Sequence, residues 1–328
     1  MSFATNEKGR SNMNVVWIGF HEEGLPAFKA VLQSDVTISG FITLDDQAFE
    51  KRSAGSREYI ILSEENDIPI YYVSTIKGEQ AFQIISELKP DLMIVLGWSE
   101  ILPECLLNIP TIGTVGTHAA LLPHNRGSAP INWALINGEN QTGNTLMWLS
   151  SEVDAGEIID QISFPITPYD TCKTLYEKVA ETNAVMLTRL INSLNNGVTP
   201  SSQIKNIISE PILPRRKPKD GLLSFHQSAE HIYNFVRALT DPYPGAFSFL
   251  CGEKWFIWKA AILPVSSKIL GLEPGEIYEK KAIGFDQNSA LLVGTETNVI
   301  LLFEIEDSCG IRYSGDKIGE LKISGRFD

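Results

Sequence analysis

The chain lacks the features of several specialised protein classes. Its 328 residues include four cysteines that are far apart and form no C-x-x-C pair: Cys105, Cys172, Cys251 and Cys309. This spacing argues against a zinc site or a disulfide frame and favours reduced thiols. No apolar run approaches the roughly 20 residues that a membrane span needs, and the polar start MSFATNEKGRSNMN has no signal-peptide core. We therefore expect a cytoplasmic protein with no membrane partner.

Basic residues are also scarce. Lys and Arg number 27 against 40 Asp and Glu, which gives a net charge of −13 at pH 7. Non-specific binding to nucleic acid or to an anionic membrane requires a local excess of Lys and Arg that displaces counterions. The charge balance therefore argues against DNA as a partner. Hydrophobic residues make up 43% of the chain, enough for packed cores, and the length predicts about two domains at roughly 150 residues each.

Common nucleotide and metal motifs are missing as well. The first expected strand-to-helix turn reads GFHEEG from Gly19, which is neither G-x-G-x-x-G nor a Walker loop. His21-Glu22 resembles the start of a zinc-binding helix motif, but no second His follows at the required spacing. The sequence thus predicts no metal and gives no direct support for a dinucleotide cofactor.

The first two hundred residues alternate between strand-like and helix-like segments. Apolar runs predict strands at 14–19, 36–43, 68–73, 91–96 and 112–115, with helices at 25–32 and 80–88 between them. Continuous apolar strands separated by helices predict a Rossmann-like α/β fold, a mostly parallel sheet with helices on both faces. Ligands of such sheets bind beyond the carboxyl ends of the strands. The loops after Gly19, Leu96 and Val115 should therefore border the site.

The last third of the chain has a different pattern. A long helix is expected at 174–194, and the segment EPILPRRKPKDG at 210–221 reads as a linker. After it we expect a helix at 229–239 and strands at 247–250, 254–259, 291–293 and 299–304. This pattern predicts a small β-rich domain, an antiparallel OB-like barrel. The predicted domains are 1–207 and 208–328, and the C-terminal strands are compatible with a homodimer interface or with the barrel alone.

One His and one Asp stand out in the stretch from 113 to 161. His118 follows an apolar strand, in a turn closed by Leu121-Leu122-Pro123, and Asp154 lies in the turn VDAG between strands expected at 144–149 and 157–163. Two strand-end loops could bring the imidazole and the carboxylate together. Such a pair can take a proton from an attacking amine, with the carboxylate orienting the ring and stabilising the imidazolium. Taken alone, a single loop His is more often a structural or surface residue.

Longer motifs in the same stretch resemble a known family. HAALLPHNRGSAPINWALINGE and TGNTLMWLSSEVDAGEIIDQ resemble the catalytic core of the folate-dependent formyltransferases, which include methionyl-tRNA formyltransferase and the formyltransferases of nucleotide-linked amino sugars. VVWIGFHEEGLPAFKAVL resembles the opening strand and helix of that family, GWSEILP its folate-site loop, and RRKPKDGLLSFHQSAEHIYNFVRALTDPYPGAFSFL the start of its C-terminal domain. The motifs occur in the expected order and cover most of the chain.

The resemblance implies formyl transfer from 10-formyltetrahydrofolate to a primary amine. The family uses an Asn-x-His motif and an Asp in a D-x-G turn. His118 matches the His, as the base and as a group that polarises the adduct, and Asp154 matches the Asp that tunes it. The chain departs at the third position, where Gly116 has no side chain to donate to the formyl oxygen. Loss of such a donor typically costs about 3 to 4 kcal/mol.

Several groups are candidates to replace the missing amide. Asn125 in the loop HNRG and Asn144 at the start of the next strand are the nearest amides by sequence, and Thr117 or a backbone N–H are others. For each amide the alternative is an ordinary turn or strand-edge hydrogen bond. A second alternative is that Gly116 marks a non-catalytic folate- or nucleotide-binding homologue.

The resemblance also outlines the folate pocket. It implies that one wall of the pterin site is formed by Leu96, Gly97, Trp98, Ile101, Leu102 and Pro103, and that Leu122, Glu152 and Val153 border it from the other side. The alternative is that Ile101 and Leu102 belong to the core and that Trp98 is a packing aromatic.

The identity of the amine acceptor depends on charge. A tRNA acceptor requires a basic second domain, yet residues 222–328 contain ten Lys and Arg against fourteen Asp and Glu, a net charge of −4. Small basic clusters at Lys51-Arg52 with Arg57, and at 215–219, suit a substrate with one or two phosphates better. Arg126, Arg215 and Arg216 are the candidate substrate contacts, with solvated surface charge as the alternative for each. GWSEIL and RRKPKDG also resemble the sugar-directed branch.

The sequence thus predicts an N-formyltransferase acting on an amino sugar, nucleotide-linked, in glycan biosynthesis. The alternatives are a methionyl-tRNA formyltransferase and the non-catalytic binder.

Overall fold

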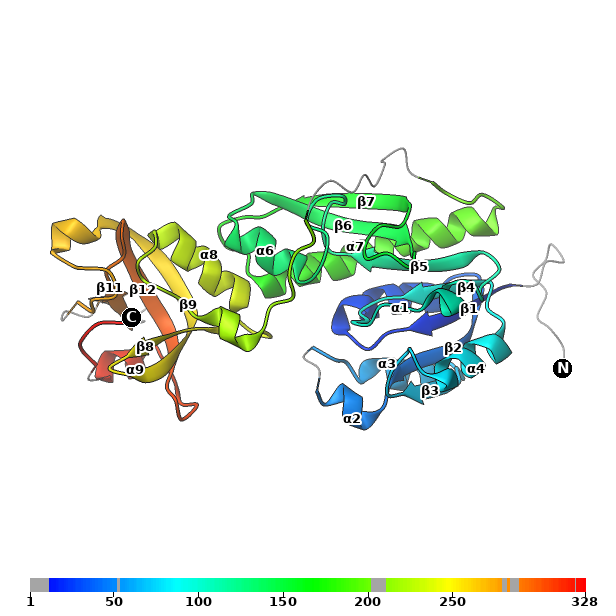
Figure 1. Ribbon diagram of the computed structural model, residues 1–328, viewed down its shortest axis with the longest axis horizontal. Helices are drawn as coiled ribbons and strands as arrows, with labels where there is room; N and C mark the ends of the chain where they lie inside the picture. The colour runs from blue at the N-terminus through cyan, green and yellow to red at the C-terminus, as the bar shows by residue number, and fades with distance from the viewer. Residues whose placement is uncertain (1–11, 52–53, 202–210, 279–281, 284–288, 322) are drawn as a thin grey trace. The chain divides into compact units, whose positions relative to one another are not determined.

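The structure, a computed structural model, describes all residues except 1–11, 52–53, 202–210, 279–281, 284–288 and 322. The chain divides into two compact units (Figure 1). The first comprises residues 1–130, 141–165 and 176–213, and the second comprises 131–140, 166–175 and 214–328. Each unit is therefore built from more than one segment of the chain. The boundary predicted between 207 and 208 lies outside the described residues.

The first unit contains a seven-stranded sheet. Its strands are β1 (Met13–Ile18), β2 (Val36–Leu44), β3 (Ile70–Val73), β4 (Leu92–Val95), β5 (Gly113–His118), β6 (Gln141–Trp148) and β7 (Ile158–Pro165), in the order β3-β2-β1-β4-β5-β6-β7. The first five strands pair in parallel, whereas β6 is antiparallel to both β5 and β7. This confirms the mostly parallel α/β sheet. The strand order reverses between β1 and β4, the place where sheets of this type bind ligands.

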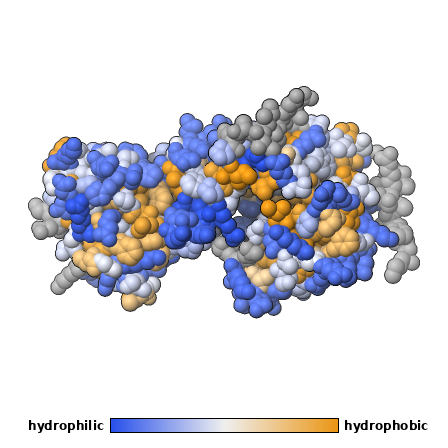
Figure 2. Space-filling model, viewed as in Figure 1, coloured by the Kyte–Doolittle hydropathy of each residue, from blue (hydrophilic) through white to orange (hydrophobic). Residues whose placement is uncertain are grey.

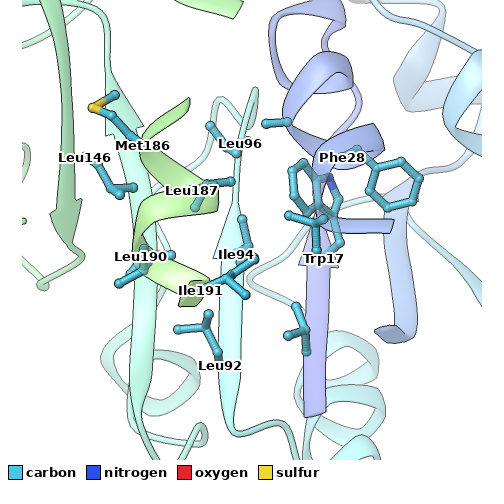
Figure 3. Packing of buried hydrophobic residues seen from close by; sticks show 14 of the residues in the cluster. Trp17, Phe28, Leu92, Ile94, Leu96, Leu146, Met186, Leu187, Leu190 and Ile191 are labelled. Carbon is cyan, nitrogen blue, oxygen red and sulfur yellow. The ribbon is translucent and has the colours of Figure 1, made fainter. Parts of the chain in front are cut away.

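Helices cover both faces of this sheet. They are η1 (Glu22–Gly24), α1 (Leu25–Leu32), α2 (Asp46–Phe49), α3 (Glu58–Glu65), α4 (Glu79–Leu88), α5 (Glu104–Leu107) and most of α7 (Cys172–Asn195). Successive strand residues point to opposite faces, so Trp17 and Ile94 pack with Leu187 of α7 in one cluster (Figure 3). Their neighbours Ile18 and Met93 pack in a second cluster on the other face.

The second unit is built around an antiparallel sheet. Its strands are β8 (Ala246–Leu250), β9 (Glu253–Ser266), β10 (Ala282–Ile283), β11 (Ser289–Val293), β12 (Asn298–Glu306) and β13 (Arg312–Ser314). The order is β10-β11-β12-β9-β8, and β13 pairs with β12. The unit also contains all of α6 (Pro130–Ile136) except its first residue, and η2 (Pro218–Gly221), α8 (Ala229–Leu239), η3 (Ser267–Leu270) and α9 (Asp316–Glu320). The expected antiparallel pairing is confirmed, although β9 is longer than predicted because bulges keep it paired with β12.

The surface of each unit seen in Figure 2 is mostly polar, as expected when the apolar side chains pack in the interior. Hydrophilic residues cover much of the visible face of each unit, interrupted by apolar patches (Figure 2). Within the described ranges, no helix is long and apolar enough to cross a membrane. The same part of the chain contains no group of three or more His, Cys, Asp or Glu side chains that could hold a metal ion.

Candidate active site

His118 is the last residue of β5, at the carboxyl end of the parallel part of the sheet. The sequence placed it in a turn after a strand ending at Val115, and that was wrong: backbone pairing with Thr145 of β6 extends the strand to His118. The residue is only 7% exposed. Its ring nitrogen Nε2 lies 2.8 Å from the carbonyl oxygen of Asn125, and Nδ1 lies 3.5 Å from Oδ1 of Asp154.

Asp154 reaches His118 from the loop between β6 and β7. Its backbone φ is +48°, a left-handed conformation that Asp tolerates better than most side chains. Its second carboxylate oxygen, Oδ2, accepts a hydrogen bond of 2.9 Å from the backbone N–H of Gly127. In the antiparallel register Trp148, the last residue of β6, pairs with Val115, so this loop begins beside β5 three residues before His118 and returns toward His118. The structure thus brings the two predicted catalytic side chains together.

The partners of His118 determine which proton positions fit the site. A backbone carbonyl only accepts hydrogen bonds, so the ring nitrogen that faces Asn125 carries a hydrogen in this arrangement. The other ring nitrogen faces a carboxylate. A second proton taken up at that nitrogen would lie between the ring and Asp154, where an ion pair can stabilise the imidazolium. The geometry suits a base that receives a proton on Nδ1.

Gly116 lies two residues before His118 and therefore on the same face of the sheet. A Cβ atom built on Gly116 would lie 2.9 and 3.1 Å from the two methyl carbons of Leu149 and 3.1 Å from the backbone oxygen of Val95. These distances are shorter than ordinary contacts, so the Leu149 side chain occupies the space that a residue larger than glycine would need. The glycine that replaces the family's asparagine at this position is therefore the residue that the surrounding side chains accommodate.

We expect Gly116→Asn to destabilise the protein by about 1 to 3 kcal/mol, the usual cost of overpacking. The double variant Gly116→Asn with Leu149→Ala should lose less than the sum of the two single variants, because truncation of Leu149 opens the space beside residue 116. Urea unfolding of the four proteins in this cycle measures the coupling. Additive losses would show that Leu149 does not restrict residue 116.

The structure separates the candidate replacements for the missing amide. Asn144 lies beside Thr145 and so faces the side of the sheet opposite to His118. There its amide donates to Thr182 and Asn183 of α7, at 3.0 and 2.6 Å. Thr117 also has the opposite orientation to His118. Asn125 is the only one of the three side-chain candidates whose backbone contacts the His118 ring, and it is buried with φ of +56°.

The predicted folate wall follows β4. Gly97 has φ of +63°, and a Cβ there would lie 2.6 Å from Cβ of His21, so this close approach of two loops requires glycine. Trp98 packs edge-on against Phe20, with ring centroids 5.7 Å apart. Its indole Nε1 is buried and has no hydrogen-bond partner among the described residues. Ile101 is 52% exposed, which leaves its apolar side chain available to a ligand.

The other residues predicted to line the folate pocket divide between core and surface. Leu96, Leu102 and Leu122 are buried in hydrophobic clusters, as the alternative interpretation of Leu102 expected. Pro103 precedes α5 as its N-cap. Glu152 is exposed, and Val153 offers its carbonyl oxygen to Arg126.

The three predicted substrate arginines have different surroundings. Arg126 is 1% exposed and donates to the carbonyl of Val153, while Glu152 lies 3.7 Å away. Arg216, in the second unit, lies over the rings of Trp133 and Phe235 at 5.0 and 5.5 Å, and burial lowers its pKa. Arg215 is exposed. The structure therefore gives Arg126 and Arg216 internal partners and leaves Arg215 in contact with solvent.

Two polar residues that the sequence did not indicate support the turn after His118. The Thr145 hydroxyl donates to the carbonyl of Ala120 at 2.6 Å and accepts from the N–H of Leu122 at 3.1 Å. The Gln161 amide donates to the carbonyl of Leu122 at 2.8 Å and to Thr145 at 2.9 Å. Their role arises because β5, β6 and β7 pair side by side, and no local pattern in the sequence predicts which residues that pairing brings together.

Comparisons with known proteins agree with the motifs. The family model for formyl transferases matches residues 32–191, and the model for the formyl transferase C-terminal domain matches 215–319. A bifunctional polymyxin resistance protein ArnA from Wigglesworthia glossinidia brevipalpis is 36% identical over 268 residues, which cover 79% of this chain. The chain spans only 39% of the length of that relative.

Solved structures show the same fold. The sugar 3N-formyl transferase WlaRD, crystallised with dTDP and 5-N-formyl-THF, aligns with a TM-score of 0.60 at 17% identity over 89% of this chain and 98% of its own. An N-formyltransferase from Helicobacter canadensis, in complex with folinic acid and dTDP-3-aminofucose, aligns with a TM-score of 0.61 at 16% identity over 88% and 98%. At these identities the two matches show the fold alone, and the family rests on the two family models and on the ArnA relative.

Proposed function

Because the chain belongs to the formyl transferase family of enzymes, we propose that it transfers a formyl group from 10-formyltetrahydrofolate to the primary amine of a nucleotide-linked amino sugar. The observation that carries the proposal is the pairing of a buried His118 with Asp154 at the carboxyl end of β5. An imidazole can take the proton that the amine loses when it attacks a formyl carbon, and a neighbouring carboxylate stabilises the imidazolium that forms.

The loop after β4 supports the folate donor. The unpartnered indole N–H of Trp98 can donate to a polar edge, and the exposed side chain of Ile101 can contact a flat ring. Gly97 and Trp98 lie beside the point where the strand order reverses. The bound donor supplies the activated formyl group.

The residues of this chain would then accept one proton from the amine and stabilise the positive charge that this proton places on the imidazole. The acceptor amine attacks as the neutral base and loses a proton as its bond to the formyl carbon forms. Nδ1 of His118 receives that proton, and Asp154 stabilises the resulting imidazolium. The Asn125 carbonyl and the Gly127 N–H hold the two side chains in place during the transfer. His118 can later return the proton to the folate nitrogen that leaves.

Charge supports a small acceptor. The region 222–328 carries a net charge of −4, and a surface of this sign repels a polyanion. Arg57, from one of the two basic clusters, is paired with Asp46 at 2.8 Å. The WlaRD and Helicobacter canadensis structures, which contain dTDP or a dTDP-sugar, also favour a nucleotide-linked amino sugar, and we propose glycan biosynthesis as the setting. Cys105, Cys172, Cys251 and Cys309 form no disulfides, which supports the cytoplasm as the compartment.

A transfer assay tests the acceptor. The protein is incubated with 10-formyltetrahydrofolate and either a panel of dTDP- and UDP-linked amino sugars or charged initiator tRNA, and tetrahydrofolate release is followed at several salt concentrations. We expect release with at least one amino sugar and weak salt dependence, because few phosphates are neutralised. Transfer to tRNA with a steep salt dependence would contradict the sugar assignment. No release with any amine would indicate the non-catalytic homologue.

A further inference from the structure

The loop 125–128 contacts both members of the catalytic pair. The Asn125 carbonyl lies 2.8 Å from the His118 ring, and the Gly127 N–H donates to Asp154. Between them, the buried side chain of Arg126 donates to the carbonyl of Val153, the residue before Asp154. Three consecutive residues therefore determine where the imidazole and the carboxylate lie relative to each other.

This loop is itself attached to a distant segment of the chain. The N–H of Leu213 donates to the carbonyl of Arg126 at 2.7 Å, and the N–H of Ser128 donates to the carbonyl of Leu213 at 3.1 Å. Gly127 and Leu213 thus form an isolated parallel β-bridge. Leu213 is the last residue of the first unit, and the chain continues at Pro214 into the second.

The glycine at position 127 makes the bridge possible. Its backbone φ is +109°, a conformation that residues with a side chain rarely adopt. A Cβ atom at this position would lie 2.5 Å from the backbone oxygen and 2.7 Å from the backbone nitrogen of Leu213. The two backbones can approach only because residue 127 has no side chain. The backbone of the loop is therefore in direct contact with the backbone of Leu213, and no larger residue fits between them.

We propose that Leu213 is a positioning residue of the catalytic site, which acts through its two backbone hydrogen bonds to the loop 125–128. The inference rests on the proposed function, in which His118 and Asp154 transfer the proton. Because Leu213 touches neither side chain, its effect passes through Arg126, Gly127 and Ser128. The segment that connects the two units is then part of the support of the active site, and the catalytic geometry depends on how that segment is held.

Removal of one backbone donor tests this role. Leu213→Pro deletes the N–H that bonds Arg126 but can keep the extended backbone. We expect kcat to fall by about 10- to 100-fold, as for other small misplacements of catalytic groups. We expect KM for the formyl donor to stay close to that of the wild type and the pH–rate profile to shift. The matched control is Thr199→Pro, because Thr199 is exposed, precedes a proline as Leu213 does, and its N–H makes no backbone hydrogen bond among the described residues.

A second variant covers the case in which Leu213→Pro does not fold. Gly127→Ala pushes Leu213 away, and Gly197→Ala is its control because Gly197 also has a positive φ, +75°, with open space around its Cβ position. We expect the first to reproduce the loss of kcat and the second to retain full activity. Folded Leu213→Pro and Gly127→Ala proteins with wild-type kcat and pH profile would overturn the proposal.

One readout separates this inference from the proposed function. The imidazole signals of His118, assigned by comparison with His118→Gln, are followed by NMR as a function of pH in the wild type and in Leu213→Pro. A changed titration in Leu213→Pro, with the Thr199→Pro control unchanged, supports the positioning role even if no acceptor is formylated. Identical titration curves would overturn that role, whatever the outcome of the transfer assay.

Discussion

Asp154→Asn is expected to lower kcat of formyl transfer by about 100- to 10,000-fold, the range that a positioned general base and its partner contribute. The asparagine keeps the size of the side chain but replaces the charged carboxylate with a neutral amide, which has one oxygen and one NH2 group. The His118 nitrogen that receives the proton then has no anion 3.5 Å away to stabilise the imidazolium. His118→Ala removes the base itself and should lose at least as much. Steady-state rates of tetrahydrofolate release measure both variants.

Binding of the folate should survive these substitutions. The residues proposed to contact it, Trp98 and Ile101, lie in the loop after β4 and do not depend on Asp154 for their placement. Titration of the formyl donor into each variant checks this point. The matched control is Asp46→Asn, an exposed carboxylate outside the site that pairs with Arg57, and it should retain wild-type kcat. Wild-type rates in His118→Ala or Asp154→Asn would end the assignment of the pair.

Gly156→Ala is expected to cost about 3 kcal/mol of unfolding free energy, at the upper end for overpacking, and to abolish most transfer. A Cβ on Gly156 would lie 1.7 Å from the backbone oxygen of Trp148, the last residue of β6. Backbone atoms cannot move aside as the end of a side chain can. The turn would therefore have to leave β6, and Asp154, two residues earlier, would move with it.

Urea unfolding and transfer kinetics together check the Gly156 prediction. The control is Gly78→Ala, because a Cβ there meets its nearest neighbours at an ordinary 3.8 Å. If Gly156→Ala retained both its stability and its kcat, the turn would not be restricted as the structure shows. A loss of stability without loss of kcat in the folded protein would mean that Asp154 does not depend on the path of this turn.

Local patterns were sufficient to predict the mostly parallel sheet and to single out His118 and Asp154 as candidates. Strand β4 is a continuous buried apolar run, and β1 and β2 are buried along their carboxyl-terminal halves, because helices cover both faces of the sheet there; each strand was predicted close to its observed bounds. Helices α3 and α6 were not predicted: the apolar residues of α3 are consecutive, and α6 is a seven-residue segment buried on nearly every side. His118 and Asp154 were identified from motifs, and the structure places them within reach of each other.

The tertiary contacts of several residues near the site could not be predicted from the sequence. Arg126 resembles a solvent-facing phosphate ligand in the loop HNRG, yet it is buried against Val153. Gly116 looks like a lost catalytic group, and only the structure shows Leu149 in the space beside it. Leu213 had no expected role before its bridge to Gly127 was seen. The sequence by itself determined the family and the sheet and proposed the reacting groups, because these depend on residue type and local period. Tertiary structure alone decided which residues hold those groups, because each such contact joins segments far apart in the chain.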